Sequence, residues 1–568
     1  MYERLFLLSF PVASFFALRF YLVNQAGTLD PYIYTGYIHN FADLIARYGL
    51  TYYSVRFGLI LPQRLFVWIF GAIWGFSVLK YLLFLSAAVP MYMVVKRHAG
   101  VNAAVLTYCA LACNPLFPRA LLWDHPDAAG VPYLLAGISL VLLQLRPGCF
   151  WDIVCGCLLG LALNSNIFTV VHIGLFFAAW LIASLLHRCF TRACILKLTL
   201  IAIGGMLVCA AGAIYYRFEA GVWNYFTPSI DMVVWLSKGG MQNWRVGGAG
   251  WIARQVYVLA PVVLLAYSLL AVRFRTRSAW ECTVVLFGIF VVAFYYVYQF
   301  ALNANILHLF YYFSYTIPSV FYLMALVYGR LWGPSDTEAC QSGRGALLCA
   351  VVLFAAPWVL MARGANVLLL GNLPRYIALS AAVGLFLIGL PRIRRSRTVK
   401  TIARTAAVVL VGVVFNMAFT QYPYAGLVRP YSAPDNRETD VYRVALQFIK
   451  AVPTVRERPG AIRFWYTNRA GSVINSVQST YLWGYSRAAE PIAEDPGMPA
   501  IGPFQMRLFG DPSLRYVALI AETQAEIEAG LAALTDHRIG FRALEHRVLR
   551  SGGCSLYLQF VELLPGKS

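Results

Sequence analysis

Apolar runs of about 18–22 residues recur from the start of the chain to about residue 420, and they limit its fold more than any other feature. A helix of that length crosses the roughly 30 Å hydrocarbon core of a bilayer. The composition agrees, because 60% of the residues are hydrophobic. We therefore expect a polytopic α-helical membrane protein with about 13 transmembrane helices. The expected spans are 4–23, 76–96, 101–118, 128–146, 150–166, 168–187, 194–216, 252–272, 280–299, 308–329, 345–362, 375–391 and 402–420.

Lysines and arginines concentrate in alternate short loops between these spans, which places those loops and the N-terminus in the cytoplasm. The first run has no small-residue cleavage site, so we expect a retained span. An odd number of spans puts the C-terminal segment outside. The outer segments contain no Asn-x-Ser/Thr sequon, which fits a bacterial inner membrane with a periplasmic C-terminal segment. The net charge of +21 is mostly explained by basic residues that orient the spans and attract anionic lipids, so we expect no nucleic-acid partner.

Hydropathy falls sharply after residue 420, and 14 of the 25 acidic residues lie beyond that point. We therefore expect a transmembrane domain over 1–420, a proline-containing linker over 421–437 and a soluble α/β domain over 438–568 on the outer side. No nucleotide-binding loop is found in it. Its expected elements are helices at 439–451 and 524–535, the second capped by Thr523, and strands at 461–467, 515–521 and 555–563.

Carboxylates are rare in the apolar domain, and six of them fall in loops expected on the outer face. Asp30 is the most informative, because it follows the first span in a long outer loop, 24–75, in which we expect short interfacial helices. A carboxylate near a membrane surface is costly unless it is paired or used, which favours a functional site. The six carboxylates are Asp30, Asp43, Asp124, Asp127, Glu219 and Asp231.

The second outer loop carries Arg119, Asp124, His125 and Asp127 within nine residues. Asp127 also fits a cap for the following helix, whereas Asp124 has no such structural role. The outer arginines Arg56, Arg119 and Arg245 run against the orientation rule. Arginine is suited to bidentate contacts with phosphate, so a lipid phosphate is one explanation. Pairing with the outer carboxylates or with lipid headgroups is the other.

Aromatic residues crowd the first outer loop, where Tyr32 and Tyr37 are candidate contacts for a sugar or an acceptor. His125, Asp127 and His308 are further candidates of the same kind. Tyrosine is also typical of membrane interfaces, and a single histidine at a span edge is commonly an interface residue. The pattern alone therefore leaves both interpretations open.

The arrangement resembles the GT-C superfamily of membrane glycosyltransferases, most of all the branch of the protein O-mannosyltransferases and the bacterial lipid A aminoarabinose transferases. The resemblance rests on about 13 spans, a long first outer loop with an early Asp, and an outer C-terminal domain. It implies inverting transfer of a sugar from a polyprenyl-phosphate donor to a lipid, glycan or protein acceptor on the outer face. It matches Asp30 to the catalytic Asp and Asp124 to a supporting acid. Many members have Asp-Glu where this chain has Asp30-Pro31.

The required chemistry fits these residues. Attack of an acceptor hydroxyl on an anomeric carbon needs a base, which Asp30 can supply. The leaving phosphate gains charge, which Arg56, Arg119 or Arg245 can stabilise without a nucleotide. A divalent metal bridging Asp30 and Asp124 is compatible with the sequence, although no pattern demands a metal or another cofactor.

Two other functions use similar partners. A flippase or secondary transporter of lipid-linked sugars would place charges near the midplane and show two similar halves. Here the polar groups cluster at one face, and no such similarity is evident. An O-antigen ligase or polymerase would have its dominant outer loop late in the membrane domain, whereas here the first loop dominates. A glycosyltransferase is therefore the preferred prediction.

Overall fold

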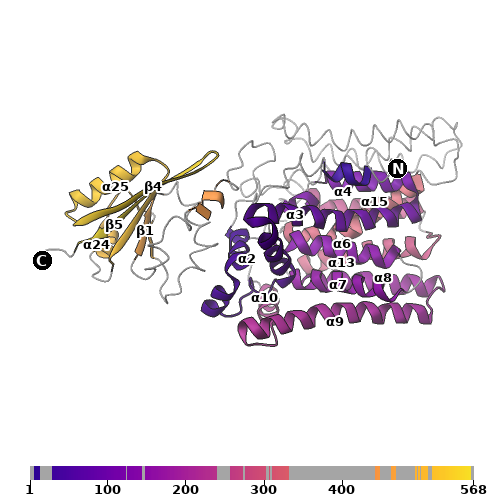
Figure 1. Ribbon diagram of the computed structural model, residues 1–568. Coiled ribbons are helices and arrows are strands. Elements are labelled where there is room, and N and C mark those ends of the chain that lie inside the picture. Colours follow the sequence, from indigo (N-terminus) through magenta and orange to yellow (C-terminus); the bar gives the residue numbers. More distant parts are fainter. Residues whose placement is uncertain are drawn as a thin grey trace, which may run out of the picture. The chain divides into compact units, whose positions relative to one another are not determined.

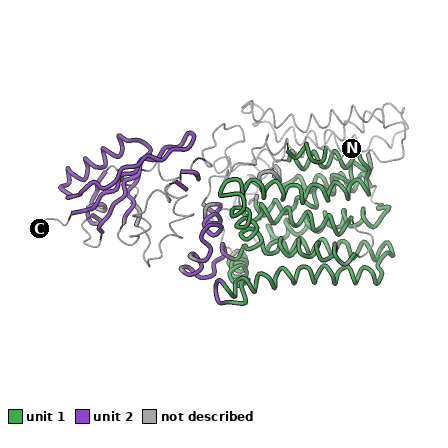
Figure 2. Tube along the Cα trace, in the orientation of Figure 1, with its two compact units in different colours: residues 1–21, 55–218, 222–432 green, residues 22–54, 219–221, 433–568 purple. Residues whose placement is uncertain are grey.

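The computed structural model divides into two compact units, which are considered separately (Figure 2). Unit 1 comprises residues 1–21, 55–218 and 222–432, and unit 2 comprises residues 22–54, 219–221 and 433–568. Within them, the structure describes residues 6–12, 29–114, 116–122, 125–143, 148–238, 256–272, 275–301, 306–307, 310–331, 440, 442–444, 446–447, 462–467, 493–495, 497–498, 500–509 and 514–564.

Unit 1 is helical wherever it has regular structure in the described ranges (Figure 1). Five of its helices, α3, α6, α8, α9 and α13, are long and apolar enough to cross a membrane, so the chain is an α-helical membrane protein. The predicted spans 345–362, 375–391 and 402–420 lie outside the described residues. The helices are α3 (Phe57–Ala99), α4 (Val101–Cys113), α5 (Leu116–Leu122), α6 (Pro126–Leu143), α7 (Cys149–Ser165), α8 (Thr169–Leu186), α9 (Arg192–Ala220), α10 (Thr227–Ser237), η2 (Val256–Leu259), α12 (Ala260–Val272), α13 (Ala279–Phe300), α14 (Phe310–Phe313), η3 (Ser314–Thr316) and α15 (Ile317–Leu331).

Local sequence fixes where helix α13 begins. The Ser278 side chain accepts a hydrogen bond of 3.3 Å from the Glu281 amide, which satisfies an otherwise unpaired donor at the start of α13. Glu281 also forms an ion pair of 2.5 Å with Arg330 at the end of α15. These contacts fix the start of α13, one residue before the span that the sequence predicts at 280–299.

Helix α3 bends sharply at Gly71, which divides it into a first limb, 57–70, and the predicted span. Gly71 has φ 80°, a conformation that side chains with a Cβ rarely adopt. The predicted outer loop 24–75 therefore ends in a helical limb. Trp68 on that limb is 83% exposed and Trp74, just after the bend, is 63% exposed. Tryptophan at such positions is typical of the bilayer interface.

Segments that the sequence predicts on one side of the membrane lie together in unit 1. Arg97 Nη1 donates to the Leu143 carbonyl at 2.6 Å, and the His98 ring stacks on Trp280 at 5.2 Å. All four residues belong to predicted cytoplasmic ends of spans. The C-terminal ends of α3 and α6 and the N-terminal end of α13 therefore lie together.

Unit 2 contains a five-stranded mixed sheet of order β2-β1-β3-β5-β4. Strand β3 pairs in parallel with β1 and antiparallel with β5, and β4 and β5 form an antiparallel hairpin. The predicted strands at 461–467, 515–521 and 555–563 are present, whereas β2 and β4 were not predicted. The strands are β1 (Ile462–Tyr466), β2 (Ala493–Asp495), β3 (Tyr516–Ala521), β4 (Phe541–Ser551) and β5 (Cys554–Leu563).

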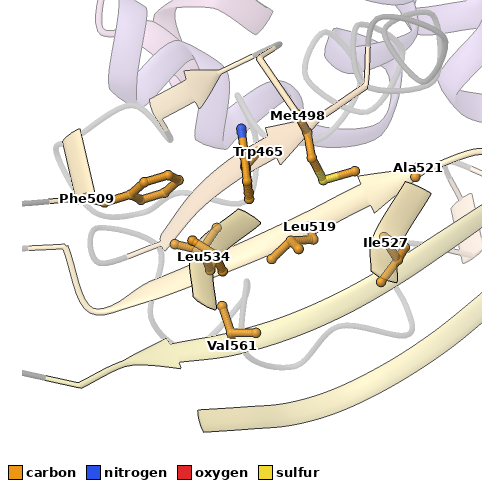
Figure 3. Packing of buried hydrophobic residues seen from close by; sticks show 9 residues of the cluster. Trp465, Met498, Phe509, Leu519, Ala521, Ile527, Leu534 and Val561 are labelled. Carbon is orange, nitrogen blue, oxygen red and sulfur yellow. The ribbon is translucent and has the colours of Figure 1, made fainter. Parts of the chain in front are cut away.

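Two helices, α24 (Pro503–Phe509) and α25 (Gln524–Asp536), accompany this sheet. Thr523 caps α25 as predicted, and Glu526 completes a capping box. Buried side chains from the strands and helices share one core, which Figure 3 shows at close range. Its members are Trp465, Met498, Phe509, Val517, Leu519, Ala521, Ile527, Leu534 and Val561.

Candidate functional site

Asp30 lies in the first turn of α2 (Leu29–Tyr48), a helix of unit 2 in the long first loop. A carboxylate there is stabilised by the partial positive charge of the helix N-terminus. The Tyr53 hydroxyl donates a hydrogen bond of 3.3 Å to Asp30 Oδ1. A residue 23 positions further along the chain therefore holds one carboxylate oxygen of the candidate base.

The turn after α2 brings Tyr53 back to Asp30. Gly49 has φ 65° at the end of the helix. Ser54 Oγ then accepts from the Thr51 amide at 2.8 Å and donates to the Thr51 carbonyl at 2.9 Å, and the Ser54 amide donates to Thr51 Oγ1 at 3.2 Å. The Tyr37 hydroxyl lies 2.9 Å from Thr51 Oγ1 and ties this turn to the middle of α2. The chain is thereby reversed along its own helix.

The protonation of Tyr53 suits its role as a donor. Burial raises the pKa of Tyr53 above its ordinary value, and the negative charge of Asp30 raises it further. The phenol therefore stays protonated at neutral pH and donates a hydrogen bond to the carboxylate. The Tyr34 ring meets Tyr53 edge-on at 5.5 Å, which limits the positions that the phenol can take.

A buried histidine–carboxylate pair occupies the turn before α6 in unit 1. His125 Nδ1 lies 2.5 Å from Asp127 Oδ1, and Asp127 is fully buried. The Ala128 amide donates to the His125 carbonyl at 2.8 Å, which fixes the turn. Asp127 lies within the first turn of α6, so it engages the histidine from inside the helix and does not precede it as a cap. A carboxylate on Nδ1 fixes the orientation of the ring.

The Tyr311 ring of α14 contacts the histidine of this pair, and further aromatic side chains adjoin Tyr311. The Tyr311 ring lies 5.2 Å from the His125 ring, and Tyr312 beside it packs on Phe168 at 5.0 Å. The Tyr295 hydroxyl donates to the Tyr312 carbonyl and lies 3.2 Å from His172 Nε2. Tyrosine rings with fixed orientation suit contact with the apolar face of a sugar or with a lipid chain.

The structure describes the side chain of one of the three predicted arginines, Arg56. Arg56 is only 2% exposed and its carbonyl accepts from the Leu59 and Ile60 amides, so it begins α3. Arg119 lies on α5, but its side chain is outside the described parts. Arg245 falls entirely outside the described residues.

Several other candidates also lie beyond what the structure describes. Asp124 and His308 fall outside the described residues, and Tyr32 is placed on α2 without a described side chain. Among the predicted residues, the structure brings His125 and Asp127 together. It adds Tyr53 and Tyr311, whose positions depend on chain reversal and helix packing and left no signal beyond a general excess of tyrosine.

A metal site is not evident in the described part of the chain. There, no group of three or more histidine, cysteine, aspartate or glutamate residues is arranged to hold a metal ion. Asp124, one half of the metal bridge considered from the sequence, is outside that part. The visible chemistry is therefore a hydrogen-bonded carboxylate in unit 2 and a buried histidine–carboxylate pair in unit 1.

No protein-family model and no curated protein sequence matches the chain. Similar solved structures include ArnT from Cupriavidus metallidurans in the apo state, with 14% identity, a TM-score of 0.47 and 98% of both chains covered. ArnT bound to undecaprenyl phosphate gives 14% identity and a TM-score of 0.45 over 98% of both chains. The Archaeoglobus fulgidus oligosaccharyltransferase tethered to an acceptor peptide gives 13% identity and a TM-score of 0.45, over 96% of this chain and 73% of that one.

Proposed function

We propose that the protein is a glycosyltransferase that moves a sugar from a polyprenyl-phosphate donor to an acceptor hydroxyl at the outer face of a bacterial inner membrane. The observation that carries the proposal is Asp30 in the first turn of α2 with Tyr53 hydrogen-bonded to its Oδ1. In this arrangement the N-terminus is cytoplasmic and the C-terminal domain is periplasmic. The acceptor is a lipid, a glycan or a protein.

Asp30 acts as the general base in the proposed reaction. It takes the proton of the acceptor hydroxyl while the acceptor oxygen bonds to the anomeric carbon. The bond from that carbon to the phosphate oxygen breaks, and its electron pair leaves with the polyprenyl phosphate. A single displacement of this kind inverts the anomeric centre. The Tyr53 hydroxyl holds one oxygen of the carboxylate, which fixes its orientation for the transfer.

The leaving phosphate needs stabilisation as its charge grows, and cationic side chains supply it. Arg56, Arg119 and Arg245 are the proposed phosphate contacts, and Asp124 is the supporting acid. His125, held on its Nδ1 by Asp127, is proposed to contact the sugar together with the neighbouring Tyr311. Tyr32, Tyr37 and His308 remain proposed contacts for the sugar or acceptor.

The test is transfer from a radiolabelled pool of polyprenyl-phosphate sugars in membranes that contain the full-length protein. Asp30→Asn keeps the shape of the side chain and removes its basicity, so we expect a loss of about 10²–10⁴-fold in kcat with little change in donor KM. Asp231→Asn is the matched control, because Asp231 is an exposed carboxylate on α10, predicted to lie at the same face. The control should transfer at the wild-type rate.

Two results would count against the proposal in different ways. Wild-type turnover by Asp30→Asn at an equal protein level would remove Asp30 from the chemistry. Failure of the wild type to move sugar from any donor tested would favour the transporter. In that case, the movement of lipid-linked sugars across vesicle membranes becomes the deciding measurement.

A further inference from the structure

A short helical segment of unit 2 connects the first loop to the sheet of the C-terminal domain. Residues 440, 442–444 and 446–447 are helical in the described ranges. At one side, the Tyr442 hydroxyl lies 2.7 Å from His39 Nε2, a contact between residues 403 positions apart. Their rings are 6.3 Å apart, and Tyr442 is fully buried. The segment therefore holds α2 through a specific polar contact.

The other side of the segment is fixed to the turn between β4 and β5. Asp440 accepts hydrogen bonds from Ser551 Oγ at 3.1 Å and from the Gly553 amide at 3.3 Å. Between them, Gly552 has φ 53°, and a Cβ there would lie 2.2 Å from Asp440 Oδ2. A Cβ at this position would push the Asp440 carboxylate aside, and the positive φ strains any residue other than glycine.

The half of α2 that receives this contact is the half that carries Asp30. The helix departs from helical geometry at Asn40, where φ is −129° and ψ is 41°. His39 comes directly before this kink, so it belongs to the same straight piece as Asp30. Nine residues of helix place the two about 13–14 Å apart along the axis. A helix of this length transmits a displacement at one end to the other as a nearly rigid rod.

We propose that the segment of residues 440, 442–444 and 446–447 forms a clasp through which the C-terminal domain positions α2, and with it the carboxylate of Asp30. His39 and Tyr442 are positioning residues in this proposal, and Asp440 with Gly552 anchors the clasp to the sheet. The effect of the clasp on catalysis rests on the role of Asp30 proposed above. The attachment of α2 to the C-terminal domain does not, because it follows from the contacts alone.

Docking is tested by hydrogen exchange of the full-length protein in detergent, read on peptides that cover α2. We expect Tyr442→Phe and Gly552→Ala each to raise exchange in residues 29–39, since the first removes the hydroxyl and the second displaces Asp440. Tyr557→Phe is the matched control, because it removes a tyrosine hydroxyl from β5 that accepts a bond of 3.3 Å from Arg550. Unchanged exchange in residues 29–39 for both test variants would overturn the clasp.

Positioning is tested by sugar transfer with the same variants. Tyr442→Phe should lower kcat about fivefold, the effect of one neutral hydrogen bond, and leave donor KM unchanged. His39→Gln keeps a polar group of similar reach, so it should retain more activity than His39→Ala. Raised exchange with normal kcat would overturn the positioning role. If the wild type itself transfers no sugar, the proposed function fails, and the exchange result still decides whether the clasp exists.

Discussion

Replacing Asp127 with asparagine removes a negative charge from a fully buried side chain without changing its shape. The carboxylate oxygen lies 2.5 Å from His125 Nδ1. A hydrogen bond to a charged group contributes about 1.5–3 kcal/mol and a neutral one about 0.5–1.5 kcal/mol. We therefore expect Asp127→Asn to lower the free energy of unfolding by about 1–1.5 kcal/mol. Asp127→Ala, which breaks the buried pair outright, should cost about 3–5 kcal/mol.

The assay is a double-mutant cycle of Asp127→Asn and His125→Gln, measured by denaturant unfolding of the full-length protein in one detergent. If the pair interacts as its geometry indicates, the loss in the double variant differs from the sum of the single losses by about 1–2 kcal/mol. Single effects that add to within about 0.5 kcal/mol would refute the reasoning, because independent sites behave in that way.

Asp152 provides the matched control for burial. It is also fully buried in the first turn of a helix, α7, and its Oδ2 accepts from the Gly148 amide at 3.0 Å. Helix α6, with 18 residues, separates its position from His125 by about 27 Å. A cycle of Asp152→Asn with His125→Gln should therefore be additive, whatever the cost of the single change.

Two further predictions concern the C-terminal sheet. Hydrogen bonds from Arg515 and Arg542 lower the pKa of Glu562, so the contribution of Glu562 to stability is complete above about pH 4.3 and is lost as the pH falls through the lowered pKa. The difference in thermal midpoint between wild type and Glu562→Gln should therefore narrow between pH 6 and pH 3. A constant difference would contradict the assignment. Leu519→Ala empties a fully buried core position and should cost about 2–5 kcal/mol, seen as faster exchange of β3 amides, whereas Leu544→Ala, at a site 43% exposed, should leave them unchanged.

The spans were the most predictable part of the fold, because the length of an apolar run and the polar residues that end it act locally. The prediction of 168–187 agrees with α8 to one residue at each end. The prediction of 308–329 was less accurate in detail, since the structure divides it into α14, η3 and α15. Pro318, the second residue of α15, lacks the amide needed to continue a helix through this point.

The two strands that were not predicted are the two edges of the sheet. Strand β4 has side chains exposed on both faces along most of its length, so its sequence shows no apolar alternation. Strand β2 has only three residues, two of them acidic. An edge strand is held by backbone pairing with its neighbour, as β4 is held by β5. The side chains of the edge strand itself do not indicate that pairing.

The site was predictable only where its residues are close in the sequence. His125 and Asp127 are two positions apart, and their density in one loop was a usable signal. The contact between Asp30 and Tyr53 depends on the reversal at Thr51, and the contact between His39 and Tyr442 depends on the folding of a distant domain. Neither long-range contact has a local pattern that could reveal it.

The bend of α3 has a consequence for the level at which neighbouring residues lie relative to the bilayer surface. Trp68 and Trp74 flank Gly71 and are largely exposed, and indole rings favour the level of the lipid headgroups. Arg56 begins the limb that these rings anchor, so the level of Arg56 is set relative to the bilayer surface. A thicker or thinner membrane can then be accommodated by tilt of the span beyond Gly71. If Arg56 contacts the donor phosphate as proposed above, that contact stays at the same level in membranes of different thickness.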